Sequence, residues 1–123
     1  MWDKGAEYVA LFPNVLLGVH NDHFFNIILT PDGTGRTNEQ IEIYYADEAA
    51  LGEDYASLRA INTAMWKTVF SEDVQVVEGM QLGRNAPGYD GGKFSAVMDE
   101  PTHHFHKWVA KELGIGEPKP QTS

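Results

Sequence analysis

Short apolar runs alternate with turn-forming and polar residues through the first half of the chain. Glu7–Phe12 is rich in residues that suit a half-buried strand, and a proline follows it. Val15–Val19 and Phe24–Thr30 are further short apolar runs of the same kind. After the turn sequence Pro31–Gly35, apolar and polar residues alternate over 40–45, which is the period of a strand with one wet face. The short connections predict antiparallel neighbours.

Helical spacing replaces this pattern in the second half. Residues recur there at steps of three and four: Leu51, Tyr55, Leu58, Asn62, Met65 and Val69. A second helical stretch is predicted over 71–82, with Gly83 as its stop. A glycine-rich loop covers 85–93, and a last helix is predicted over 99–113 with proline in its first turn. Strands followed by helices predict an α+β fold, an antiparallel sheet with helices packed on one face.

Composition narrows the classes of partner. The 123 residues suffice for one domain with a core, and the absence of cysteine excludes disulfides and thiolate metal sites. Eighteen acids against nine bases give a formal net charge of -9, the wrong sign for nucleic acid or an anionic membrane surface. No apolar run is long enough for a membrane span or a signal peptide. We therefore expect a cytoplasmic protein that binds neither nucleic acid nor membrane.

Asp73 interrupts an apolar stripe. On a helix its same-face neighbours are all apolar: Trp66, Val69, Phe70, Val76, Val77 and Met80. A carboxylate buried among them would be costly unless it were paired, hydrogen-bonded, protonated or bound to a metal. The structural alternative is that Ser71 or Asp73 is the N-cap of a helix that restarts there.

Several segments match the motifs of one family in the right order. Phe70–Gly83 resembles the ED-xxx-VE-xx-Q-x-G signature near the C-terminus of Rieske non-haem iron oxygenase α subunits. These are the ring-hydroxylating oxygenases and their relatives that oxidise quaternary amines. Leu11–Asn14 resembles the family's LFPN strand end, Gly91–Ser95 its G-x-x-S loop, and His104–Val109 its terminal helix. The match covers nearly the whole chain apart from the tail.

This resemblance implies a fold and a boundary. The fold would be the helix-grip catalytic domain, an antiparallel sheet that wraps a long C-terminal helix around a substrate cavity. Residues 1–115 would be the C-terminal portion of that domain, incomplete by itself, and 116–123 a flexible tail. The family's two histidine ligands lie upstream of the matched segment. We therefore expect the chain alone to be inactive and to bind iron weakly.

The resemblance also implies the chemistry of the complete α subunit. Asp73 would be the carboxylate of a two-histidine, one-carboxylate Fe(II) site that activates O2. Electrons would come from NAD(P)H through a partner reductase or ferredoxin and a Rieske [2Fe–2S] cluster in the missing N-terminal part. The substrate would be an aromatic ring or a quaternary ammonium compound. The alternative from another class is a non-catalytic helix-grip module that binds an apolar small ligand.

Candidates for the substrate pocket are His20, His23, Trp66, Phe70 and Val77. The pairs His20/His23 and His103/His106 could also be imagined as metal sites, although surface or packing roles are more common for such pairs. Aromatic residues are expected mainly in the core, namely Phe24, Phe25, Tyr44, Tyr45, Trp66 and Phe70. A sheet that lacks neighbouring strands should expose an apolar edge with Val9, Leu11, Leu16 and Phe25, so we expect a homo-oligomer.

Overall fold

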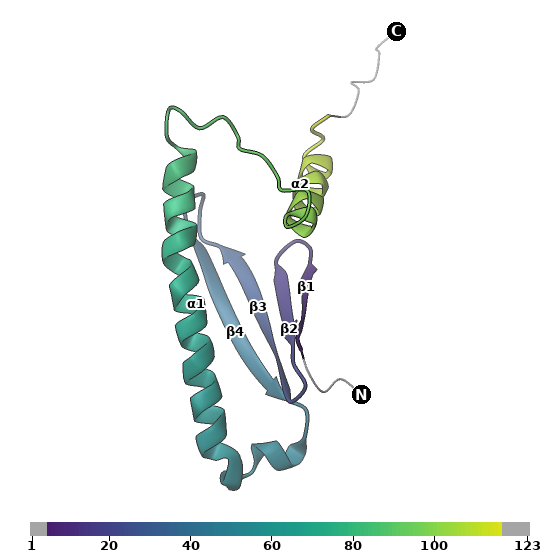
Figure 1. Cartoon of the computed structure of the whole chain (residues 1–123), viewed down its shortest axis with the longest axis vertical. Helices are drawn as coiled ribbons and strands as arrows, with labels where there is room; N and C mark the ends of the chain where they lie inside the picture. Colours follow the sequence, from purple (N-terminus) through teal and green to yellow (C-terminus); the bar gives the residue numbers. More distant parts are fainter. Residues whose placement is uncertain (1–4, 117–123) are drawn as a thin grey trace. The chain divides into compact units, whose positions relative to one another are not determined.

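The computed structural model describes residues 5–116 and has an α+β architecture. Four strands form one antiparallel sheet in the order β1-β2-β3-β4, so each strand pairs with the next in sequence (Figure 1). The strands are β1 (Glu7–Leu11), β2 (Val15–Val19), β3 (His23–Pro31) and β4 (Thr37–Tyr45). The predicted fold class is confirmed: an open antiparallel sheet with a long helix along one face. The chain divides into two compact units between Val77 and Glu78.

The last three residues of the LFPN motif, Phe12, Pro13 and Asn14, form the turn between β1 and β2. Its Phe12–Pro13 peptide bond is cis. Asn14 then ties the turn to the third strand, because its Nδ2 donates to the Leu29 carbonyl and its own carbonyl accepts from the Leu29 amide, both at 2.9 Å. The motif thereby fixes where β2 begins beside β3.

A single helix, α1 (Ala56–Arg84), covers the region where two helices are predicted. Two short 3-10 turns precede it, η1 (Glu48–Leu51) and η2 (Glu53–Tyr55), and Asp47 caps the first with a 2.8 Å bond from the Ala49 amide. The helix therefore starts later than its periodicity suggests. No proline interrupts it and its first glycine is Gly79, so nothing in the sequence breaks it near residue 70.

The N-cap interpretation of Ser71 and Asp73 is wrong. Both residues lie well inside α1, where backbone amides already have helical partners. The Ser71 hydroxyl instead donates to the Lys67 carbonyl at 2.6 Å, and Thr68 donates to Ala64 in the same way at 3.1 Å. Such bonds to the preceding turn are the usual alternative for hydroxyl residues inside a helix.

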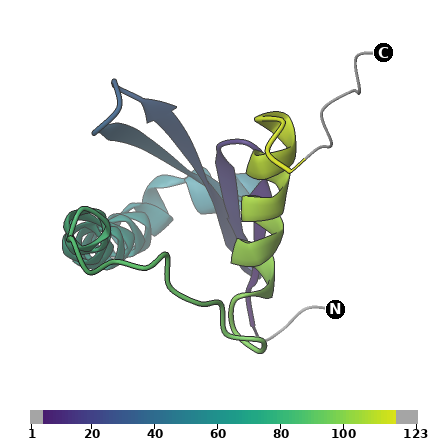
Figure 2. The same cartoon turned by 90° about the horizontal axis from the view of Figure 1, so that it is seen from above.

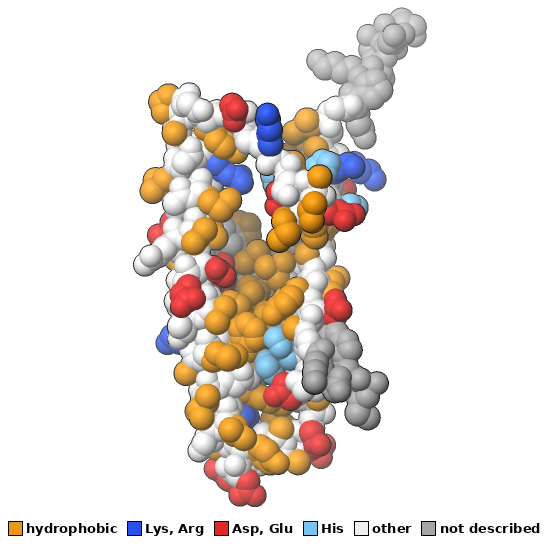
Figure 3. Space-filling model, in the orientation of Figure 1, with side chains coloured by type: hydrophobic (Ala, Val, Ile, Leu, Met, Phe, Trp, Pro, Cys, Tyr) orange, Lys and Arg blue, Asp and Glu red, His pale blue; other side chains and the backbone are white. Residues whose placement is uncertain are grey.

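The core lies between α1 and one face of the sheet (Figure 2). In the described part of the chain its buried apolar side chains are Phe25, Ile27 and Trp66, and four more pack against them: Leu29, Ile41, Ile43 and Phe70. Alternation along β3 and β4 puts the strand members of this set on one face. The core is small for the chain length, and many hydrophobic side chains show at the surface over the sheet and α1 (Figure 3).

Two of the aromatic residues expected in the core are exposed instead. Phe24 and Tyr44 are 39% and 41% exposed, and their rings stack on each other at 4.6 Å. They are paired opposite one another in the sheet, and the two-residue period turns both away from α1. Phe25 was expected both in the core and near an open edge, and it is buried in the core, whereas the other edge candidates, Val9, Leu11 and Leu16, are exposed. No helix in the described range combines the length and apolarity that crossing a bilayer requires.

The second unit contains helix α2 (Glu100–Glu112), with Pro101 in its first turn as predicted. The loop before it is closed by reciprocal contacts, because the Ser95 amide donates to the Asp99 carboxylate at 2.6 Å and the Asp99 amide donates to the Ser95 carbonyl at 3.2 Å. Phe94 packs on the rings of His103 and His106, with centroids 4.8 Å and 5.1 Å away. These two histidines thus have a packing role within the unit.

Candidate functional site

An aromatic cluster on the helix-facing side of the sheet brings together four of the predicted pocket residues. The rings of His20 and His23 stack at 4.7 Å, and His20 meets the edge of Trp66 at 5.2 Å. Trp66 in turn stacks on Phe70, one turn further along α1, at 5.4 Å. The fifth residue, Val77, does not join this cluster and is 61% exposed.

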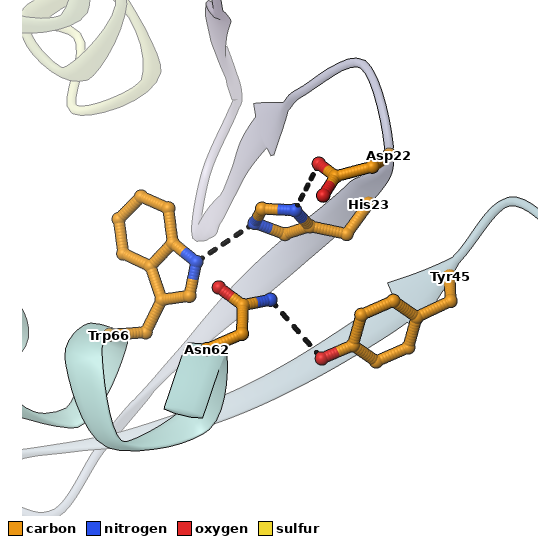
Figure 4. Close-up of polar contacts among 5 residues, drawn as sticks. All are labelled: Asp22, His23, Tyr45, Asn62 and Trp66. Carbon is orange, nitrogen blue, oxygen red and sulfur yellow. Dashed lines mark hydrogen bonds and ion pairs between the residues drawn. The ribbon is translucent and has the colours of Figure 1, made fainter. Parts of the chain in front are cut away.

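His23 is held from both sides (Figure 4). Its Nδ1 lies 2.7 Å from an Asp22 carboxylate oxygen, and its Nε2 lies 2.9 Å from the Trp66 indole nitrogen. An indole nitrogen only donates and an ionised carboxylate only accepts, so the imidazole is neutral with its proton on Nδ1. Both ring nitrogens are therefore occupied, and neither is free for a metal or a substrate.

Electrostatics at this end of the sheet follow from the same contacts. The hydrogen bond from His23 lowers the pKa of the Asp22 carboxyl below its ordinary value, against an opposing effect of partial burial. Burial lowers the pKa of His20, the nearby His23 lowers it further, and Asp22 partly offsets both. The Nε2 of His20 is buried and has no hydrogen-bond partner among the described residues. His20 is thus kept in its neutral form more strongly than a free histidine.

Next to the cluster, a groove of about 450 Å³ runs between β4 and α1. It is lined by Ile41, Ile43, Tyr45, Arg59, Thr63, Trp66, Lys67 and Phe70. The floor is apolar and aromatic, with a few polar groups around it, as is usual for small-ligand sites. One of the lining residues, Tyr45, is also bonded to α1, because Asn62 donates to its hydroxyl at 3.1 Å (Figure 4).

Asp73 lies on α1 beyond this cluster, and it is exposed. The predicted burial is wrong because its apolar neighbours are themselves uncovered: Val69 is 39% exposed, Val76 60% and Met80 55%. Seven residues separate Asp73 from Trp66, which puts the two within about 20° on the helix and about 10.5 Å apart along its axis. The Asp73 carboxylate has no hydrogen bond or ion pair with any described residue. Its carboxylate is therefore available.

This carboxylate fits one position of the donor set that a mononuclear iron site needs, since hard oxygen ligands suit Fe(II) together with imidazole. The rest of the set is not assembled here. Within residues 5–116, no group of three or more histidine, cysteine, aspartate or glutamate side chains is close enough to hold a metal ion. Asp73 as an iron ligand stays a prediction.

Sequence comparison places residues 2–115 in the family described as the ring hydroxylating α subunit, catalytic domain. The chain belongs to this family. The match covers both the sheet with its LFPN turn and the long helix with Asp73. The expectation drawn from the sequence motifs is confirmed at the level of the family.

Curated relatives include enzymes with amine substrates in their names. The chain is 30% identical to putrescine 2-hydroxylase of Ralstonia nicotianae over 113 residues, which cover 89% of this chain and 30% of that protein. It is 27% identical to putrescine 2-hydroxylase of Bordetella bronchiseptica over 94% of this chain and 27% of the relative. It is 24% identical to the chloroplastic choline monooxygenase of Spinacia oleracea, over 88% of this chain and 24% of that protein. The chain thus spans less than a third of each relative, and no solved structure matches it.

Sequence reasoning missed the polar contacts around the cluster, in which Asp22 bonds to His23 and Asn62 to Tyr45. It also missed the bonds from Arg59 to the Ala50 and Gly52 carbonyls. Asn62 carried a usable signal, because it is polar at a position where the helical spacing expects an apolar residue. The helical spacing predicts the wrong contact face for α1, displaced by one residue towards the N-terminus. Leu58, Met65 and Val69 are exposed, whereas Arg59, Trp66 and Phe70, each one residue later, contact other elements.

Proposed function

We propose that this chain is the C-terminal part of the catalytic domain of an oxygenase α subunit that hydroxylates a small amine at a mononuclear Fe(II) site. Asp73 would be the carboxylate ligand of that site, and two histidines outside this chain would complete it. The single observation that carries the proposal is the free, exposed carboxylate of Asp73 on the helix of a chain that belongs to the ring-hydroxylating family. Electron-transfer partners and a cytoplasmic location are part of this proposal.

Amine substrates are favoured over aromatic rings by the names of the relatives, putrescine 2-hydroxylase and choline monooxygenase. The half-buried ring of Phe70, which lines the groove one turn before Asp73, suits an ammonium group through cation–π contact. Bound iron would supply the activation of O2. In the net reaction one oxygen atom enters a C–H bond, and the other leaves as water with two electrons and two protons.

Replacement of Asp73 in the complete α subunit tests this role. Asp73→Ala should remove mononuclear iron and product formation, because an oxygen ligand is lost. The melting temperature should hold, since the side chain is exposed and alanine is the better helix former by up to about 0.7 kcal/mol. Iron content, product yield and thermal unfolding are the three measurements.

Glu72→Ala is the matched control, because it removes the neighbouring exposed acid of the same helix. It should keep iron and product. Retained iron and turnover in Asp73→Ala would sink the proposal.

The alternative, a non-catalytic module for an apolar ligand, is favoured by the groove beside β4. It would gain if the α subunit bound a substrate analogue in that groove and formed no product with iron, reductase and O2 present.

A further inference from the structure

Side chains from successive turns of α1 bond to the rest of the first unit. The Arg59 guanidinium donates to the carbonyls of Ala50 and Gly52 at 2.5 and 2.8 Å. One turn later Asn62 donates to Tyr45, and one turn after that Trp66 donates to His23. Of these contacts, only Trp66–His23 is buried on both sides, with each residue 8% exposed.

The Trp66–His23 bond is also the last of the series. Phe70 makes ring contacts one turn further on, and beyond Phe70 no side-chain hydrogen bond joins the described residues of α1 to the sheet. Asp73 is the next residue on the same line of the helix. The direction in which its carboxylate points therefore depends on how α1 is held about its axis at Trp66.

Helix dimensions give the distance that the carboxylate moves when α1 rotates about its axis. A carboxylate about 5 Å from the helix axis moves by about 1 Å when the helix rotates by about 10°. Misplacement by about 1 Å can cost a reaction a factor of about 100. A contact that prevents this rotation would thus affect the reaction rate even if it added little to the free energy of unfolding.

An aromatic hydrocarbon at position 23 would fill the same space but would leave the buried indole N–H of Trp66 without an acceptor. Histidine supplies the acceptor at Nε2, provided that its proton stays on Nδ1. Asp22 holds the proton there at 2.7 Å, and the stacked ring of His20 fixes the plane of the imidazole. The three residues thus define one orientation for the indole.

We propose that His23 is a positioning residue: kept as the Nδ1–H tautomer by Asp22, it fixes Trp66 and thereby the rotation of α1 that aims Asp73. This inference rests on the proposed role of Asp73. The residue needs no contact with iron or substrate, because it acts through Trp66.

The tautomer can be measured in the unaltered 123-residue chain. Long-range ¹H–¹⁵N correlation at neutral pH should show His23 with a protonated Nδ1 and an Nε2 shift typical of an acceptor. Asp22→Ala should turn the signal into a mixture of tautomers. A dominant Nε2–H form in the unaltered chain would overturn the proposal, and this result needs neither iron nor a variant that folds.

The positioning effect is measured in the iron-loaded α subunit with three variants. His23→Phe removes the acceptor, His23→Gln offers an amide oxygen to Trp66, and Ile27→Val lowers stability in the core without touching the bond. We expect His23→Phe to form about tenfold less product per O2 consumed, which is the size of loss that follows mutation of residues orienting metal ligands. The variant should also alter the spectrum of the iron–nitric oxide complex. His23→Gln should recover most of the loss.

Two results would count against a positioning role: an unchanged spectrum and coupling ratio in His23→Phe, or an equal loss in Ile27→Val. Failure of the proposed function looks different, because Asp73→Ala would then keep iron and product whatever the His23 variants do.

Discussion

Gly18 and Phe25 offer a sharp test of the sheet. They lie directly opposite each other in β2 and β3. A Cβ on Gly18 would overlap Cζ and Cε1 of the Phe25 ring and lie 2.9 Å from Cε2. The ring cannot simply swing away, because it is 3% exposed and Trp66 and Phe70 hold its other side with centroids at 4.5 and 5.3 Å.

The cost of Gly18→Ala follows from these contacts. Overpacking of a filled core costs about 1–3 kcal/mol, and complete loss of a buried phenylalanine ring would cost about 3–5 kcal/mol. The lower flexibility of alanine in the unfolded chain returns about 0.4–1 kcal/mol. We expect a net loss of about 2 kcal/mol in the free energy of unfolding, which corresponds to a fall of about 6–12 °C in melting temperature for a chain of this size.

Urea titration followed by far-UV circular dichroism measures this loss. Gly79→Ala is the matched control, since nothing lies within 4 Å of its added Cβ and it sits inside α1. It should stabilise by about 0.8–1 kcal/mol. Phe25→Leu replaces the ring by a shorter side chain and should remove most of the stability loss caused by Gly18→Ala. The double-mutant cycle should therefore be strongly non-additive. A neutral Gly18→Ala, or an additive cycle, would refute the placement of Phe25 over β2.

Two further predictions concern pH and association. Burial lowers the pKa of His20 in the folded chain, so the unfolded chain takes up a proton first as the pH falls below the ordinary value of 6.5. The free energy of unfolding should therefore decrease from that pH down to the lower pKa of the folded chain and stay constant below it. In urea titrations between pH 8 and pH 4, His20→Gln should flatten this part of the profile. Val76, Val77 and Met80 have exposed apolar side chains, which should make the isolated chain self-associate at micromolar concentration. Replacement of all three by serine should shift sedimentation towards the monomer. An unaltered chain that sediments as a monomer would contradict this prediction.

The strands could be predicted from the sequence because their signals are local. Alternation over 40–45 gave the correct inward face of β4, and the turn residues after β3 gave a hairpin. What failed was the assignment of single aromatic residues. Phe24 and Phe25 are adjacent and equally apolar, and only the pairing register decides which one faces α1.

The helix shows a different limit. Its apolar residues occupy two adjacent lines, so spacing alone could not tell which line meets the sheet. Trp66 is on the buried line, while Met65 and Val69 are on the exposed one. Asp73 was singled out for being buried among apolar neighbours, and this premise is wrong. The family match rests on sequence similarity and does not depend on that premise.

The contact between His23 and Trp66 joins residues 43 positions apart, so no local pattern could show it. Once it is known, the order of residues on α1 gains a physical meaning. Arg59, Asn62 and Trp66 bond the helix to its surroundings, Phe70 packs beside them, and Asp73 follows with a free carboxylate. Beyond the last of these contacts, the rotation of the helix sets the direction in which the Asp73 side chain leaves the backbone. Under the proposed function the exposed carboxylate would bind the metal and the buried imidazole would fix the helix that carries it, so the role of His23 depends on that of Asp73, whereas the tautomer of His23 can be measured by itself.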